Sequence, residues 1–318
     1  MFEILISIAI LFGFLFLGML LARSSWVQHS RMVARLTGIT LCALLFFMGF
    51  RLGKEMEGTS QLTEIGILSL SVAIATALGT GLVLGVAFWV VRFSTTPPIP
   101  GARNYKPNRP LVNRKLAARH LKDPIALSAC VALGYIAGSL FPYESFSGAL
   151  ASTWLLRLLL LSVGIDLARS QVDFRAAFIG KETIIVPLGT AAGSLAGGLC
   201  ASFFFSMSPG ESLSVAAGFG WYSLSGAIIT DLGDPALGAV AFMSNIIRET
   251  IGLLTIPLVA ASRYPLVAIG LGGATSMDVT LPVIERSCGP HTVPLSIASG
   301  LFLSLLVPFL VPIFYKLG

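Results

Sequence analysis

The sequence has 318 residues, of which 55% are hydrophobic and 11% are charged, and its mean hydropathy is +0.87. Soluble domains carry about 25% charged residues, so this composition excludes a soluble protein and indicates a polytopic membrane protein. Runs of about 20 apolar residues without two-residue alternation favour an all-α fold over a barrel. The net charge of +6 does not indicate nucleic-acid binding, because eight of the 21 basic residues lie in one acid-free segment, Arg92–Lys122.

We predict about eight transmembrane helices from the apolar runs. They cover residues 3–22, 37–54, 66–91, 124–142, 150–168, 182–206, 236–261 and 291–315. Two further apolar stretches, 212–230 and 266–284, are interrupted by glycine, serine, threonine or proline and are marginal as full crossings. We interpret both as re-entrant hairpins, which are tolerated at membrane depth only where protein or a water-filled cavity shields the backbone.

The placement of lysine and arginine predicts the orientation. With the N-terminus outside, most basic residues fall in cytoplasmic segments, so we expect both termini to lie outside. The proline-rich basic loop, 92–123, is interpreted as an anchor beside anionic headgroups, and a lipid- or nucleic-acid-binding arm is the alternative. The N-terminus lacks a basic n-region, so no cleaved signal peptide is expected.

Two internal repeats suggest how the chain is divided. Leu45–Leu52 resembles Leu160–Leu167, which predicts two inverted three-span units within an N-terminal block, residues 1–206. In residues 207–318, Gly218-Phe219-Gly220 aligns with Gly270-Leu271-Gly272, which predicts a transport core of two hairpin-plus-helix repeats. Inverted repeats with broken helices are typical of secondary transporters. Chance similarity between apolar segments is the alternative.

Two acidic residues in apolar surroundings are the main functional candidates. Glu249 lies inside a predicted span beside Arg248, where an ionisable side chain costs roughly 2.5–3.5 kcal/mol and usually marks an ion or substrate path. Adjacent helix positions point about 100° apart, so we expect Glu249 to line a cavity and Arg248 to make a structural contact. Asp278 is interpreted as a ligand or proton carrier, and capping of the following helix is the alternative.

Polar and aromatic residues around these acids are candidate substrate contacts. They are Trp221, Tyr222, Ser223, Ser225, Asn245, Arg248, Thr275 and Ser276. Trp221 and Tyr222 fit either an aromatic wall for a cation or an interfacial belt. We predict no metal and no cofactor. We also predict no enzymatic activity, because no histidine lies mid-span beside a serine nucleophile.

Two further polar features are expected to be structural. Arg157 is interpreted as a buried counter-ion whose partner the sequence does not identify. The segment Asp231–Asp234 is interpreted as a surface turn, since nothing near it resembles the phosphate cradle that usually accompanies a magnesium site.

At three motifs the sequence resembles the LysO-type lysine exporters of bacterial inner membranes. These are GFGWYSLSG at 218–226, Arg248-Glu249, and GATSMDVTLP at 273–282, within a specific region of about 212–290. The resemblance implies gradient-driven export of L-lysine and lysine analogues. It also implies eight spans with two re-entrant loops, and a functional acid pair at Glu249 and Asp278.

The hypothesis is therefore lysine/proton exchange, with both acids alternately binding protons and the lysine ammonium group. The expected partners are L-lysine, protons and membrane lipids, without nucleic acid, and a homodimer is left open. A sodium/proton or other cation antiporter is the nearest alternative, because the hydroxyls around Asp278 offer oxygen ligands. A passive channel and an intramembrane enzyme are more distant alternatives.

Overall fold

The computed structural model describes residues 2–22, 30–55, 59–91, 122–140, 148–169, 181–205 and 207–318. Every regular element in these residues is a helix, in agreement with the predicted all-α fold. The long helices are α1 (Phe2–Leu21), α2 (Ser30–Glu55), α3 (Thr59–Val90), α5 (Lys122–Leu140), α6 (Ala149–Arg169), α8 (Glu182–Phe204), α11 (Pro235–Ala260) and α14 (Val293–Leu317). The predicted basic loop, 92–123, lies outside the described residues except for its last two.

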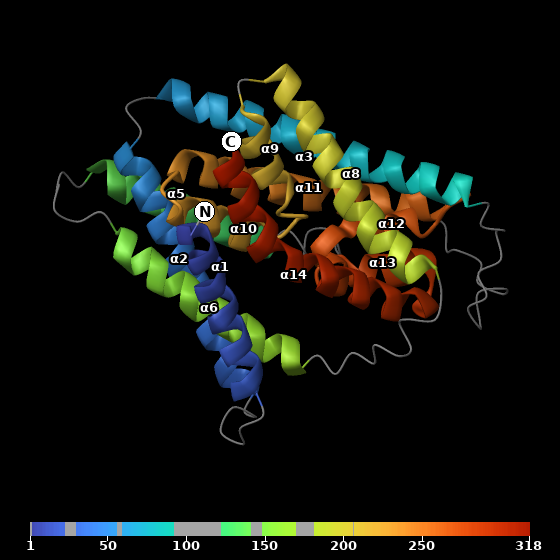
Figure 1. Cartoon of the computed structure of the whole chain (residues 1–318), viewed down its shortest axis with the longest axis horizontal. Coiled ribbons are helices and arrows are strands. Elements are labelled where there is room, and N and C mark those ends of the chain that lie inside the picture. The colour runs from blue at the N-terminus through green and yellow to red at the C-terminus, as the bar shows by residue number, and fades with distance from the viewer. Residues whose placement is uncertain are drawn as a thin grey trace.

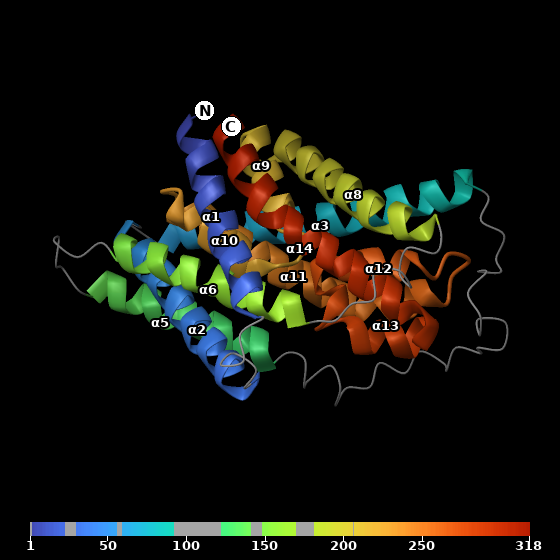
Figure 2. The same cartoon turned by 60° about the horizontal axis from the view of Figure 1, so that its bottom comes forward.

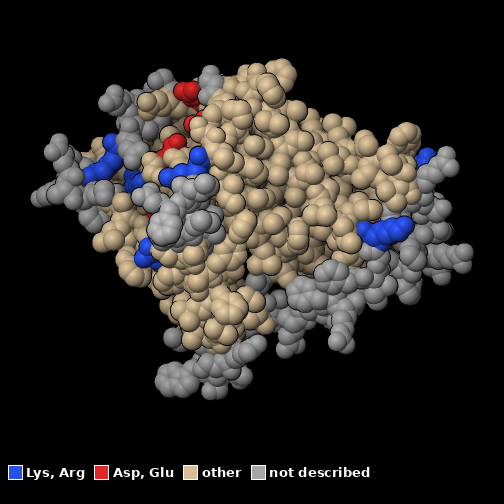
Figure 3. All heavy atoms as spheres, in the orientation of Figure 1, with Lys and Arg blue, Asp and Glu red and all other residues tan. Residues whose placement is uncertain are grey.

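Six of the long helices are long and apolar enough to cross a membrane. Their candidate spans are 35–54, 61–90, 149–166, 182–204, 235–260 and 290–317, while α1 and α5 contain shorter apolar stretches, 9–21 and 125–140. The outside of the molecule is apolar: Leu82, Phe203 and Phe204 are 68%, 78% and 81% exposed. On the face shown in Figure 3, described lysines and arginines lie toward the two ends, with a broad uncharged surface between them. The chain is thus a polytopic helical membrane protein.

Two segments between the long helices are helix–break–helix units. The first unit comprises α9 (Pro209–Ala216) and α10 (Tyr222–Asp231). The second comprises α12 (Val267–Gly272), the 3-10 helix η3 (Gly273–Met277) and α13 (Leu281–Cys288), and the short η4 (Pro290–Thr292) leads into α14. These units coincide with the two stretches that were predicted as hairpins.

Each unit returns to the side of the molecule from which it starts. The first begins at Gly210 against the C-terminal end of α14, and ends at Asp231 beside Pro312 of that helix. In the second, the Cys288 thiol at the end of α13 donates to the Pro265 carbonyl, 3.5 Å away and just before α12. Both units are therefore hairpins in shape, with their breaks at the far end.

The other helices form pairs that cross at glycines. The pairs α2–α5, α1–α6 and α3–α8 pack most closely, and α1, α2, α5 and α6 gather on one side of the molecule (Figures 1 and 2). A Cβ on Gly49 of α2 would collide with the carbonyl oxygen of Val131, and a Cβ on Gly164 of α6 with that of Leu15. Small residues at such crossings let the helix backbones touch.

We expect Gly49→Ala to lower the stability of the fold by about 1–3 kcal/mol, because the added methyl forces α2 and α5 apart. Gly38→Ala on the same helix is the control, since a Cβ at Gly38 meets nothing within 4 Å. Thermal unfolding in detergent measures both. Equal melting temperatures for the two variants would contradict this packing.

Candidate functional site

The breaks of the two hairpins meet inside the molecule. The Ala274 amide donates to the Phe219 carbonyl over 2.9 Å, which joins the second break to the first. Phe219, Gly220 and Gly273 have φ values of 49°, 98° and 61°. Such backbone is costly for residues with a side chain, and glycine supplies it at two of the three positions. The glycines of the two motifs thus allow both helices to end and their tips to touch.

Arg248 lies against both tips. Its side chain is 2% exposed, and one terminal nitrogen donates to the Thr80 hydroxyl over 3.3 Å. A Cβ on Gly220 would lie 3.3 Å from its Nη1 atom, and a Cβ on Gly273 would lie 2.6 Å from it. The two glycines therefore leave the space that the guanidinium fills. In this conformation Arg248 lies in a contact between the two hairpins.

Asn245, one turn before Glu249, holds the first break. Its side-chain oxygen accepts from the Gly220 amide over 2.7 Å. Its side-chain nitrogen donates to the Val215 and Ala241 carbonyls, and to the Ser225 hydroxyl. The Asn245 side chain thus satisfies the Gly220 amide at the helix break and ties the break to α11.

We expect Asn245→Ala to cost about 1–3 kcal/mol of stability, because the Gly220 amide is then buried without a partner. Ser244→Ala is the matched control, since the Ser244 hydroxyl donates only to the Ala241 carbonyl of its own helix. Thermal unfolding of the two purified variants makes the comparison. A Ser244→Ala loss as large as the Asn245→Ala loss would contradict the role assigned to Asn245.

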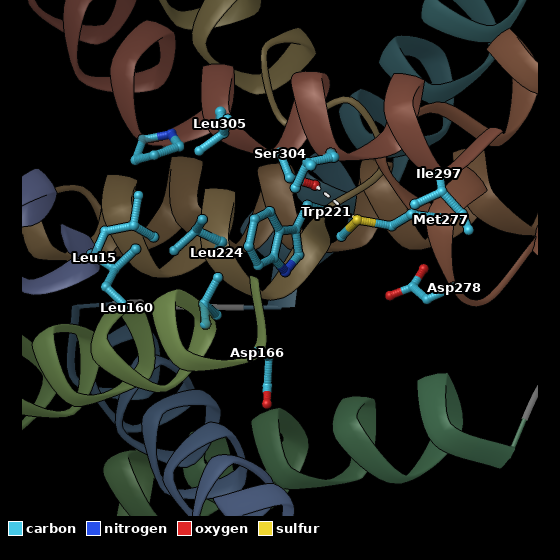
Figure 4. A pocket seen from close by; sticks show the side chains of 13 residues that line it. Leu15, Leu160, Asp166, Trp221, Leu224, Met277, Asp278, Ile297, Ser304 and Leu305 are labelled. Carbon is cyan, nitrogen blue, oxygen red and sulfur yellow. Dashed lines mark hydrogen bonds between the residues drawn. The ribbon is translucent and has the colours of Figure 1, made fainter. Parts of the chain in front are cut away.

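A cavity of about 390 Å³ lies between the hairpins and the N-terminal helices (Figure 4). Helix α1 contributes one lining residue, α6 three, the two hairpins four and α14 five. They are Leu15, Leu160, Val163, Asp166, Trp221, Leu224, Met277, Asp278, Ile297, Leu301, Ser304, Leu305 and Pro308. The lining is thus mostly apolar, and its two charged residues are both acids.

Asp278 is the predicted acid that lines this cavity. It follows η3, its residue is exposed, and its carboxylate accepts from the Val279 amide over 2.6 Å. The alternative capping role is not seen: α13 begins at Leu281 and has no side-chain cap. Asp278 is therefore positioned to meet a solute in the cavity.

Glu249 lies behind this surface. It is 2% exposed, and its Oε2 atom has no hydrogen-bond partner among the described residues. No residue of α11 lines the cavity, so the expectation that Glu249 faces it directly differs from the structure. The hairpins pack against α11, and no described residue of α11 reaches the lining of this cavity.

Of the remaining candidates, one lines the cavity and the others are buried in the packing of the hairpins. Trp221 lines the cavity, whereas Tyr222 is buried and packs edge-to-face on Phe242, 5.6 Å between ring centroids. Ser223 is buried and does not line the cavity. The hydroxyls of Ser225, Thr275 and Ser276 donate to the carbonyls of Trp221, Gly272 and Ser296. In this conformation these three hydroxyls hold the hairpins.

Sequence reasoning did not select Asp166 of α6 as a site residue, although it lines the cavity with Asp278. The available signal was its position in an otherwise apolar span, where a carboxylate is expensive. Its proximity to the second hairpin depends on packing between distant parts of the chain.

Together these features define a multi-pass helical membrane protein with paired broken helices around a solute-sized cavity. The family model described as "Lysine exporter LysO" matches residues 12–99 and 128–315. The chain is 35% identical over 277 residues to the lysine exporter LysO of Escherichia coli strain K12, covering 85% of this chain and 86% of that protein. It is 34% identical over 164 residues to a candidate lysine exporter of Haemophilus influenzae, covering 52% of this chain and 84% of that protein. No solved structure matches.

The chain therefore belongs to the LysO family of lysine exporters, which confirms the resemblance found in the sequence. It is accordingly a membrane transport protein.

Proposed function

We propose that this protein is a secondary active exporter of L-lysine across the bacterial inner membrane, exchanging lysine for protons. Membership of the LysO family supports lysine as the cargo. The observation that carries the proposal is the carboxylate of Asp278 on an otherwise mostly apolar cavity between two helical blocks. Lysine analogues with the same charge and stem are expected cargo as well.

The chemistry of the cavity fits the side chain of lysine. An aliphatic stem packs against Leu224, Met277 and Ile297, while the terminal ammonium pairs with Asp278. Trp221 offers a ring face to the same cation. The mostly apolar lining leaves the Asp278 carboxylate as the main ion-pair partner for this ammonium among the hairpin residues of the cavity.

Exchange for a proton removes the electrical obstacle to export. Moving one positive charge outward against an inside-negative potential costs about 2.3 kcal/mol per 100 mV. If a proton enters for each lysine that leaves, no net charge moves, and the pH gradient drives export. We assign substrate binding to Asp278, which lines the cavity, and proton binding to Glu249, which is buried behind it.

The proposed topology has eight crossings and two re-entrant hairpins, with both termini outside. The proximity of the two termini in Figures 1 and 2 supports an even number of crossings. The return of each hairpin to its starting side supports re-entrant insertion. Membrane lipids contact the apolar exterior.

The proposed division is into an N-terminal block, 1–206, and a transport core, 207–318. Gly49 and Gly164, which align in the first repeat, make equivalent close crossings on α2 and α6, and this supports inverted three-span units. In the second repeat, α9 packs on α14 as α12 packs on α11, which supports two hairpin-plus-helix units.

Counterflow in proteoliposomes tests the proposed cargo. Vesicles that carry the purified protein and are loaded with lysine are expected to accumulate labelled lysine transiently. Vesicles that carry the protein but contain no lysine are not. Competition by arginine and ornithine then ranks the related cations. Sodium flux without any lysine counterflow would contradict the proposal and support the cation antiporter alternative.

A further inference from the structure

A second, smaller cavity of about 110 Å³ lies among α1, α6, α10 and α14. It is lined by Ile10, Leu11, Thr153, Leu156, Arg157, Ile228, Asp231, Leu232 and Pro312. Unlike the main cavity, it brings a basic side chain, Arg157, together with an acidic one, Asp231. Its volume accommodates several water molecules or a small polar group, but is much smaller than that of the main cavity.

The two cavities follow one another along the same four helices. On each helix, one residue that lines the second cavity lies four positions along the chain from a residue that lines the main cavity. The pairs are Leu15 and Leu11 on α1, Leu160 and Leu156 on α6, Leu224 and Ile228 on α10, and Pro308 and Pro312 on α14. Four residues of α-helix rise about 6 Å, so the second cavity is one helical turn further along.

The direction of this step is set by the chain ends. It runs toward the N-terminus of α1 and the C-terminus of α14, which lie together in Figures 1 and 2. Under the proposed topology both ends are outside. The second cavity then lies on the outer side of the main one, where an exported solute passes last.

Contacts with neighbours hold both charged groups of the second cavity. The guanidinium of Arg157 lies over the rings of Trp154 and Phe14, 4.8 and 5.9 Å from their centroids. The carboxylate of Asp231 accepts from the Thr153 hydroxyl. In the described residues, Arg157 thus contacts aromatic rings and Asp231 accepts from a hydroxyl. Both groups keep capacity for further hydrogen bonds: a guanidinium has five donors and a carboxylate about four acceptor sites.

This pairing complements the head group of an amino acid. The planar guanidinium binds a carboxylate through two parallel hydrogen bonds, and the Asp231 carboxylate accepts from an ammonium group. The main cavity lacks this complementarity in the described chain, because both of its charged lining residues, Asp166 and Asp278, are acids. A lysine bound there finds a partner for its ammonium groups but no cation for its carboxylate.

We propose that the second cavity is an outer binding station for the amino-acid head group, with Arg157 binding the α-carboxylate and Asp231 the α-ammonium. The station rests on the proposed function and deepens it. It recognises the zwitterion, while Asp278 recognises the side-chain cation, so the two stations together distinguish lysine from a simple diamine.

Competition experiments test the station. Counterflow of labelled lysine is measured in proteoliposomes while external lysine, lysinamide or Nα-acetyl-lysine competes. Lysinamide lacks the carboxylate, and Nα-acetyl-lysine lacks the α-ammonium. Arg157→Gln is expected to weaken competition by lysine about tenfold while leaving lysinamide unchanged, since one charged hydrogen-bonded contact is lost. In Asp231→Asn, the amide oxygen can still accept from Thr153. This variant is expected to weaken competition by lysine and to leave competition by Nα-acetyl-lysine unchanged.

Two further variants keep the outcome clear. Leu158→Ala, at an exposed position that lines neither cavity, is expected to behave as the unaltered protein. Arg157→Lys keeps the charge and is expected to recover part of the lysine affinity. If Arg157→Gln weakens competition by lysine and by lysinamide equally, or weakens neither, the proposed outer binding station is wrong, although the proposed lysine export stands. If the unaltered protein shows no lysine counterflow, the proposed function and the station both fail.

Discussion

Glu249→Gln is expected to abolish export driven by a pH gradient and to leave lysine counterflow in place. Glutamine keeps the shape of the buried side chain but cannot carry a proton through the exchange cycle. Asp278→Asn is expected to weaken both activities strongly at low lysine concentration, because the cavity then lacks the carboxylate that pairs with the lysine ammonium. Losing that charged contact costs about 1.5–3 kcal/mol, a reduction in lysine affinity of roughly tenfold to a hundredfold.

Both activities are measured on the same proteoliposome preparations. Glu285→Gln is the control for removing an acid. Glu285 lies on α13, in the same hairpin as Asp278, and its side chain is exposed. It is expected to retain counterflow and pH-driven export. Preserved pH-driven export in Glu249→Gln would remove Glu249 from the mechanism, and it would then be a packing residue only.

Gly273→Ala is expected to destabilise the folded protein by roughly 3 kcal/mol. The position has a φ of 61° and a ψ of −134°, a conformation that residues with a side chain rarely adopt and that costs them roughly 1–3 kcal/mol. The new methyl would also collide with the Phe219 carbonyl oxygen and lie 2.6 Å from Arg248 Nη1. Overpacking of this kind adds about 1–3 kcal/mol. The two hairpin tips would separate, so we expect lysine counterflow to be lost as well.

Gly233→Ala isolates the backbone contribution. Gly233 has a φ of 109°, but a Cβ there meets nothing within 4 Å. This control is expected to lose roughly 1–2 kcal/mol and to keep transport. Thermal unfolding in detergent, followed by counterflow, compares the two proteins. Equal destabilisation would mean that the contact between the hairpin tips contributes little to the fold.

Local sequence patterns predicted much of the architecture. Apolar runs located the long helices, and glycines within two of the shorter runs located the breaks that the structure has near Gly220 and Gly273. The alignment of Gly49 with Gly164 selected two positions where helix backbones touch. Asp278 could also be selected, because a carboxylate in a glycine-rich break has few structural explanations.

The lining of the cavities could not be predicted in the same way. Asp166 and Asp278 line one cavity, and Arg157 and Asp231 line the other. Residues so far apart in the sequence share a cavity only because of tertiary packing, which no local periodicity encodes. The hydroxyls of Thr275 and Ser276 resembled ligands because they lie beside an acid. In this structure the Thr275 hydroxyl donates to the Gly272 carbonyl at the helix break, and the Ser276 hydroxyl donates to the Ser296 carbonyl of α14. Glu249 was expected on the cavity surface because the sequence does not reveal that hairpins cover α11.

Simultaneous recording of lysine and proton movement tests the central claim most directly. Proteoliposomes carrying the purified protein are held at zero membrane potential, and an inward proton gradient is imposed on trapped labelled lysine. We predict that net lysine efflux proceeds against the lysine gradient while protons enter. In Glu249→Gln, net lysine efflux and proton entry are both expected to vanish, and only one-for-one lysine exchange remains. Lysine efflux that follows an imposed voltage, without any proton movement, would contradict this claim.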